Sequence, residues 1–204
     1  MNLKKTTYHH GNLREVLISS ALEILKEGTL EDLSLRALAR KAGVSQTAPY
    51  RHFEDKEALI VVLILEGSQI LRNGMRTTRD KSSDPVESII NCGLNYYDFA
   101  AAHPAHFRLM FGGNINELRK KYPELQEADE KSRKIVEPLF HECMKFKTAP
   151  DKPEELIQIG CWSLVHGLSH LLLNDVDSTI IGRDNKRVVA KETISLYLTS
   201  LFKK

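Results

Sequence analysis

Polar side chains with hydrogen-bonding groups gather in a short segment near the start of the chain, residues 45–53. If this segment is helical, four of them project outward: Gln46, Thr47, Tyr50 and Arg51. Gln46 and Thr47 fall in the first turn, the part of a recognition helix that reaches base edges. A glutamine amide can pair bidentately with adenine, which discriminates against other bases by about 1–3 kcal/mol. The pattern predicts readout of a DNA major groove; the alternative is a helical hairpin whose polar face is merely solvated.

Aromatic and imidazole side chains form a second group in the later part of the chain. Trp162, His166 and His170 are spaced so that they share one face of a helix. Together with aromatic residues between 96 and 111, they suit a largely apolar cavity with a few polar groups, the usual form of a small-molecule site. The alternative is that they fill the hydrophobic core. The predicted ligand-binding set is Tyr96, Phe99, His103, Phe107, Met110, Phe111, Trp162, His166 and His170.

Metal binding and catalysis are weaker interpretations of these residues. His103, His166 and His170 could bind a metal, but no carboxylate or cysteine stands in ligand spacing with them. The chain has no Gly-rich phosphate loop, nucleophile elbow or HExxH motif. Cys161 and His166 would not face each other on a helix. We therefore expect no metal, no cofactor and no enzymatic activity.

The composition is that of a soluble globular protein, with 204 residues of which 42% are hydrophobic and 27% charged. The formal net charge is only +2, so any DNA-binding surface must be local. The longest apolar run, residues 58–65, is far shorter than the roughly 20 residues of a membrane-spanning helix. The basic N-terminus lacks the apolar segment of a signal peptide. We expect a cytoplasmic protein with no membrane contact, whose three cysteines are reduced and buried.

Two short helices around a glycine must position the first group of side chains. Apolar residues at i, i+3, i+4 and i+7 give the first helix one buried face: Leu35, Leu38, Ala39 and Ala42. Ser34 can cap this helix, a contribution of about 1 kcal/mol relative to alanine. Gly43 can take the left-handed conformation that ends it, and Ser45 can cap the second helix. The pattern predicts a helix-turn-helix over residues 34–53.

Helical periodicity continues on both sides of this motif. An earlier stripe that starts after Asn12 completes a three-helix unit, and a helix over residues 55–76 follows it. The apolar run in that later helix could be a strand, but no second strand exists to pair with it. The remaining helices are expected at 85–103, 105–111, 114–147 with an interruption near Pro123 and a kink or break at Pro138, 154–173 and 185–202. The prediction is an all-α protein of about nine helices, with a DNA-binding domain at 1–54 and a ligand-binding and dimerisation domain at 55–204.

The segment AGVSQTAPYRHFEDKEAL resembles the recognition-helix region of the tetracycline-repressor (TetR) family of bacterial transcription regulators. The residues that match one by one are Ser45, Tyr50, His52, Phe53, Asp55 and Lys56. Where the family usually has an aliphatic residue before the tyrosine, this chain has Pro49. A proline at this position removes a backbone donor and distorts the start of the helix. The segments YHHGNLR, HPAHFRLMF and WSLVHG are similar to the subgroup whose C-terminal ligand-binding domain carries a Trp-His-Gly motif.

This resemblance implies a homodimeric regulator, most often a repressor, that a small-molecule effector of unknown identity releases from a palindromic operator in double-stranded DNA. It also implies phosphate contacts by Tyr50, His52 and Lys56, with Arg36 on the preceding helix. The full predicted DNA-binding set is Arg36, Ser45, Gln46, Thr47, Tyr50, Arg51, His52 and Lys56. The alternative is an effector-independent architectural dimer, which would bind DNA without needing a cavity.

The last two helices are expected to form the dimer interface as a four-helix bundle. Small residues on one helix, Gly160, Ser163 and Gly167, would let the backbones approach closely. An apolar stripe on the other helix would complete the interface: Ile194, Leu198 and Leu201. The alternative is that both stripes pack inside the monomer.

Overall fold

The computed structural model describes residues 13–113, 115–146, 148–174 and 185–202. Every regular element in these residues is helical, which confirms the all-α class and gives nine α-helices. Contacts divide the chain into two compact units, Met1–Leu63 and Ile64–Lys204. This division falls inside one long helix, whereas the predicted domain boundary between residues 54 and 55 lies just ahead of it.

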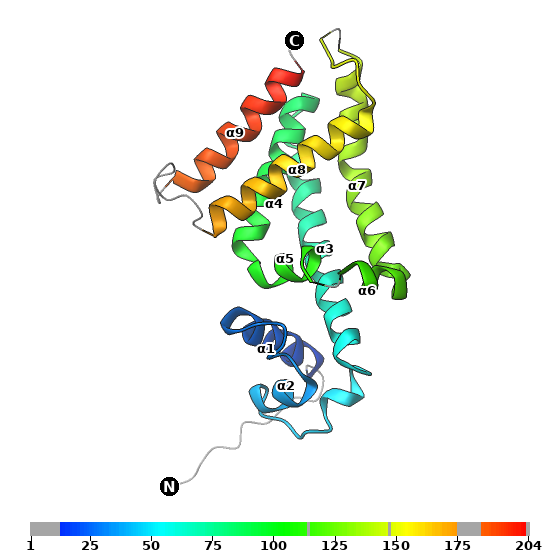
Figure 1. The fold of residues 1–204 in the computed structure, drawn as a ribbon, viewed down its shortest axis with the longest axis vertical. Helices are drawn as coiled ribbons and strands as arrows, with labels where there is room; N and C mark the ends of the chain where they lie inside the picture. Colours follow the sequence, from blue (N-terminus) through cyan, green and yellow to red (C-terminus); the bar gives the residue numbers. More distant parts are fainter. Residues whose placement is uncertain (1–12, 114, 147, 175–184, 203–204) are drawn as a thin grey trace. The chain divides into compact units, whose positions relative to one another are not determined.

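The first unit contains the helices and the turn that position the DNA-binding segment (Figure 1). Its elements are α1 (Leu13–Glu27), α2 (Leu35–Lys41), the 3₁₀-helix η1 (Pro49–Arg51) and the first turns of α3 (Lys56–Arg79). Ser34 caps α2, because its Oγ accepts a hydrogen bond of 3.1 Å from the Ala37 N–H. Gly43 has a φ of 67°, in the left-handed region that disfavours a side chain. Both local signals for the turn are confirmed.

The second helix of the motif is shorter than predicted and is not an α-helix. Pro49 has no N–H to donate to the Ser45 carbonyl, which instead accepts a hydrogen bond of 3.0 Å from the Ala48 N–H. Bonds from Arg51 to Ala48 and from His52 to Pro49 then close a 3₁₀ turn. Pro49 is fully buried. The distortion expected from this proline is therefore present, and it extends to the helix type.

The second unit is organised around α4 (Pro85–Ala102), which contacts α5, α7, α8 and α9 (Figure 1). The other helices are α5 (Pro104–Phe111), α6 (Ile115–Lys121), α7 (Pro123–Met144), α8 (Glu154–Leu173) and α9 (Lys186–Leu201). Asp84 caps α4 by accepting a hydrogen bond from the Val86 N–H at 3.0 Å. Leu94 and Tyr97 of this helix are buried in one core cluster with Leu172 of α8. Four of the other helices in the second unit thus pack against α4.

Two prolines affect the chain differently in this unit. Pro123 begins α7 after α6 has ended, so the predicted interruption is confirmed. Pro138 lies inside α7, which continues past it to Met144, so this proline does not break the helix.

The apolar run at residues 58–65 is helical, as predicted, and forms part of α3. Among the described helices, α3 and α8 are long and apolar enough to cross a membrane by length and composition alone. Such a match is weak support for a membrane span, because core helices of soluble proteins also meet these criteria.

Candidate nucleic-acid interface and ligand cavity

The polar face of the first unit carries most of the residues predicted to contact DNA. Those with exposed side chains are Arg36, Ser45, Gln46, Thr47, Tyr50, Arg51 and His52. Phe53 is buried, and the Arg14 guanidinium covers its ring at 5.7 Å from the centroid. The predicted orientations of this segment are confirmed, whereas DNA contact by these side chains stays a prediction.

Lys56 has an internal role that the resemblance did not indicate. Its Nζ donates a hydrogen bond to the carbonyl oxygen of Leu30, in the loop between α1 and α2. Hydrogen bonds from Thr29 lower the pKa of Asp32 in this loop, and the charge of Lys56 adds to the effect. Lys56 therefore holds the start of α3 against the loop, and its ammonium group is already engaged by the protein.

Exposed cations on α2 complete the polar face. Arg36 and Arg40 form no ion pair with any residue that the structure describes. Lys41 on the same helix differs, because its Nζ lies 3.0 Å from Glu27 Oε2 on α1. Arg40 was missing from the predicted set, since it lies outside the matched motif. Its exposure beside Arg36 makes it a further candidate for a phosphate contact.

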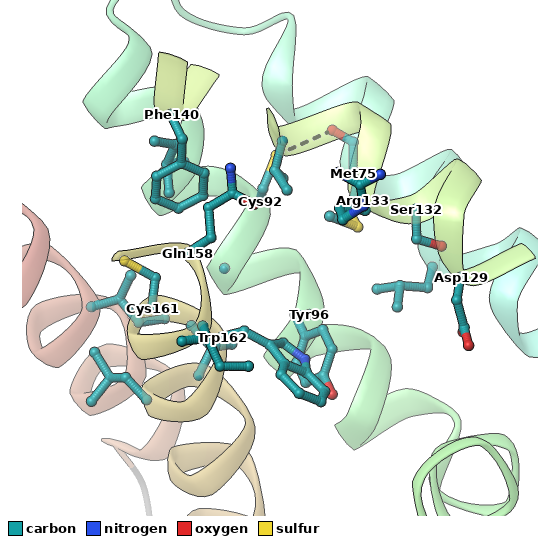
Figure 2. Close-up of a pocket in the computed structure, with 18 of the residues that line it drawn as sticks. Met75, Cys92, Tyr96, Asp129, Ser132, Arg133, Phe140, Gln158, Cys161 and Trp162 are labelled. Carbon is teal, nitrogen blue, oxygen red and sulfur yellow. Dashed lines mark hydrogen bonds between the residues drawn. The ribbon is translucent and has the colours of Figure 1, made fainter. Parts of the chain in front are cut away.

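The second unit contains a partly open cavity of about 620 Å³, which lies within the range of small-molecule sites. Its lining comes from helices α3 to α9, and Figure 2 places Tyr96 of α4 next to Trp162 of α8. Four predicted ligand residues line the cavity: Tyr96, Met110, Phe111 and Trp162. The sequence did not single out the apolar residues that line much of the rest, among them Leu71, Met75, Ile89, Phe140 and Val165.

The other predicted ligand residues do not line this cavity: Phe99, His103, Phe107, His166 and His170. Several of them stack where α5 faces α8. The Phe107 ring centroid lies 5.5 Å from that of His166 and 5.2 Å from that of His170. Phe99 stacks on His103 at 5.5 Å. Phe99 and Phe107 are buried and follow the packing alternative. His170 is exposed, and His103 and His166 are partly exposed, so these three do not fill the core. None of the five is among the residues that line the cavity, and their assignment as lining is corrected.

His166 does not line the cavity but forms a hydrogen bond with Tyr96, which does. The Tyr96 hydroxyl lies 2.8 Å from His166 Nδ1. Burial raises the pKa of Tyr96, so its hydroxyl keeps its proton. Burial and the nearby His170 lower the pKa of His166, so its imidazole is neutral at pH 7, and the hydrogen bond joins the protonated tyrosine hydroxyl to Nδ1 of a neutral imidazole. This hydrogen bond fixes the orientation of a tyrosine in the cavity wall.

Close packing joins α5 to α3 near the cavity. A Cβ added at Gly67 of α3 would lie 2.9 Å from His106 Cβ and 2.9 Å from Met110 Sδ. His106 is only 4% exposed, and its Nε2 lies 3.6 Å from Glu66 Oε2, beyond hydrogen-bond distance. Burial lowers the pKa of His106, and His103 adds to this effect, while the Glu66 carboxylate opposes it.

This buried imidazole should make the protein less stable in mild acid. Because the pKa of His106 is lower in the folded than in the unfolded chain, its contribution is fully present above the unfolded pKa of about 6.5 and is lost as the pH falls below it. Thermal unfolding at a pH of about 7.5 and of about 5.5 measures the loss. In His106→Gln the difference in Tm should shrink, whereas His141→Gln, at an exposed site, should behave like the parent. An unchanged difference in His106→Gln would contradict this assignment.

The outer surface of α8 and α9 carries large apolar side chains that the monomer leaves exposed. They are Leu156, Ile159, Trp162 and Leu171 on α8 and Val188 and Leu196 on α9. The predicted interface residue Ser163 is exposed on α8, and Gly160 and Gly167 are partly exposed there. A Cβ at Gly167 would meet nothing within 4 Å, so this residue lies at an open position of the monomer.

The α9 part of the predicted interface needs correction. Ile194 and Leu198 are only 1% and 2% exposed, and both line the cavity. Leu201 is partly buried. The apolar residue that α9 presents outward is Leu196, which is 72% exposed. Ile194 and Leu198 therefore pack inside the monomer, which was the alternative to a place in the dimer interface.

In the described part of the chain, no three histidine, cysteine or acidic side chains are grouped so that they could hold a metal ion. The cysteine thiols are buried, and burial raises the pKa of Cys92 to about 11 and that of Cys161 to about 12. Both thiols line the cavity as uncharged groups.

Comparisons with known proteins agree with this division into a helix-turn-helix and a helical cavity domain. Residues 17–63 match the family "Bacterial regulatory proteins, tetR family", and residues 89–184 match "Tetracyclin repressor-like, C-terminal domain". The second match contains the Trp162 to Gly167 motif.

Solved structures share the fold over nearly the whole chain. A Rhodococcus sp. RHA1 protein of unknown function is 26% identical, with a TM-score of 0.75 over 95% of this chain and 98% of its own. The fatty acid degradation regulator FadR from Bacillus halodurans is 15% identical, with a TM-score of 0.72 over 94% and 96% of the two chains. The TetR family regulator PfmR from Thermus thermophilus is 21% identical, with a TM-score of 0.67 over 91% and 98%. At the identities of the last two, the likeness concerns the fold alone.

Proposed function

Because the chain belongs to the TetR family of transcription regulators, we propose that it is a repressor that a small molecule releases from its operator. The observation that carries this proposal is the cavity of about 620 Å³ in the second unit. An architectural DNA-binding dimer without an effector would have no use for such a cavity, so the cavity counts against that alternative. The polar face around Gln46 supplies the DNA-binding side of the proposal.

Coupling between the cavity and DNA would run along α3. This helix contributes Ser68, Leu71 and Met75 to the cavity lining, and its first turns belong to the DNA-binding unit. In a dimer, a shift of α3 changes the separation of the two recognition segments, and half-sites one helical turn apart require about 34–36 Å. The effector must bind the arrangement that does not fit DNA more tightly, since equal affinity for both arrangements would shift nothing.

The proposed assembly is a homodimer in the cytoplasm, bound to a palindromic operator. Support for the dimer comes from the exposed apolar residues on α8 and α9, which a soluble monomer would leave in contact with water. The exposed Ser163 and the partly exposed Gly160 would let two copies of α8 approach closely. A two-fold axis in the protein then matches the symmetry of the operator.

Substitutions at Gln46 and Arg36 test the DNA-binding side of the proposal. Selection of bound sequences from random DNA should give a palindrome with the parent. Gln46→Ala should change the preferred base at one position per half-site, by about 1–3 kcal/mol. Arg36→Ala should weaken binding to all sequences alike and reduce the salt slope by about 1. Titrations at several salt concentrations measure both effects.

Arg36 is the better phosphate variant because Lys56→Ala would also remove the hydrogen bond to Leu30. A uniform loss of affinity in Gln46→Ala would contradict its assignment as a base reader. If the parent selected no sequence at all, the proposed function itself would be wrong.

A further inference from the structure

Most of the cavity wall consists of hydrocarbon, aromatic and thiol groups. Leu71, Ile89 and Phe140 are among the apolar lining residues, and the thiols of Cys92 and Cys161 are uncharged. The Tyr96 hydroxyl is already bonded to His166. A charged group placed among these side chains would lose its hydration without gaining a partner.

Every charge on the described lining is carried by four residues, two arginines and two acids: Arg119, Arg133, Asp129 and Glu155. Arg119 Nε lies 2.7 Å from Asp129 Oδ2, so these two charges neutralise each other. Arg133 Nη1 lies 2.7 Å from Glu137 Oε1 on the next turn of α7. Each guanidinium therefore already has an acidic partner, whereas Glu155 is exposed and has no ion pair with any residue that the structure describes. No lysine or histidine is among the described lining residues.

Polar lining groups stand on two sides of the cavity. Figure 2 shows Asp129, Ser132 and Arg133 together on α7, and Gln158 near Cys161 on α8. Ser132 and Gln158 supply neutral hydrogen-bonding groups. A ligand could place one hydrogen-bonding group against either of them and its hydrocarbon body against the apolar walls.

We propose that the cavity takes an uncharged, mainly hydrocarbon molecule that carries a neutral hydrogen-bonding group, such as a hydroxyl. This inference rests on the proposed function, because it names the chemical class of the effector. A carboxylate could reach an arginine only in competition with the acidic partner of that arginine. An ammonium group could pair with Glu155, but this exposed carboxylate is solvated by water, so such a pair contributes at most about 1 kcal/mol. In both cases the ligand charge gains less than the loss of its hydration among the apolar side chains costs, which lowers the affinity.

Trp162 gives the test a direct readout. It is the only tryptophan of the chain, it lines the cavity, and it is 47% exposed, so a ligand that covers its indole should change its emission. The probes are 1-octanol, octanoate and octylammonium, which share one chain and differ in the charge of the head group. Each is titrated into the full-length protein at neutral pH, and calorimetry on the same samples gives a second measure of affinity.

Octanol is expected to bind at least about tenfold more tightly than octanoate or octylammonium. The inference is overturned if either charged probe binds as tightly as octanol or more tightly. It is also overturned if no probe changes the emission of Trp162 or releases heat.

Measuring operator affinity in the presence of each probe distinguishes a failure of this inference from a failure of the proposed function. Tight binding of a charged probe that still releases the operator would leave the proposed function standing and replace only the ligand class. Octanol that binds without any effect on operator affinity would support the ligand class and contradict effector-controlled repression.

Discussion

Replacing Leu196 by aspartate is expected to give a monomer at micromolar concentration that binds a palindromic operator at least about 100-fold more weakly than the parent. Among the large apolar side chains that the structure describes, Leu196 is the most exposed, at 72%. In the proposed dimer it would be buried, and an unpaired carboxylate there opposes association. In the monomer the same carboxylate remains in water, so the free energy of unfolding should change by less than about 0.5 kcal/mol.

Light scattering and operator titration measure the two parts of this result. A dissociated protein would scatter as a single species of 23.2 kDa. Leu196→Met is the matched control, because it keeps an apolar side chain of similar volume and should remain dimeric. A dimeric Leu196→Asp protein with parental operator affinity would place the interface elsewhere. A monomeric parent would refute the dimer itself.

Replacing Cys161 by phenylalanine is expected to remove the response to a cavity ligand while leaving DNA binding intact. Cys161 lines the cavity and is buried, so a phenyl ring at this position would occupy space that a ligand needs. The affinity for 1-octanol should fall at least about tenfold, and operator release should be lost with it. Operator affinity without ligand should change by less than about twofold, because Cys161 lies outside the DNA-binding unit.

Cys161→Ala is the matched control, since it removes the thiol without filling the cavity. A larger ring can overpack its surroundings at about 1–3 kcal/mol, so thermal unfolding of both variants accompanies the titrations. Unchanged octanol affinity in a folded Cys161→Phe protein would show that the ligand binds elsewhere.

The local parts of the fold could be predicted because single residues determine them. Ser34 caps α2 through its own hydroxyl, and Gly43 supplies the left-handed backbone of the turn. Pro49 also indicated a distortion, since a missing N–H is a property of the residue itself. Its full effect, a 3₁₀ turn in place of an α-helix, depends on where the freed Ser45 carbonyl finds a donor, and the sequence does not contain that information.

The cavity was only partly predictable because its walls and the core use the same residue types. Trp162 and Tyr96 do line it, but Phe107 on a neighbouring face of α5 packs against His166 instead. Leu71 and Met75 could not be recognised, because an aliphatic stripe looks the same whether it faces a neighbour or an empty volume.

The error on α9 has a related cause. This helix is apolar on an inner and an outer face, and periodicity alone does not say which face is which. Ile194 and Leu198 turned out to face inward, while Leu196 between them faces solvent.

Helices α3 and α5 are closely packed at Gly67. There is no room for even one methyl group between them, since an added Cβ would lie 2.9 Å from His106 Cβ. Met110 belongs both to this contact and to the cavity wall. Under the proposed function, a ligand that displaces Met110 would therefore push against α3 as well, because the two helices are closely packed at this point. A larger residue at position 67 would force α3 and α5 apart even without a ligand.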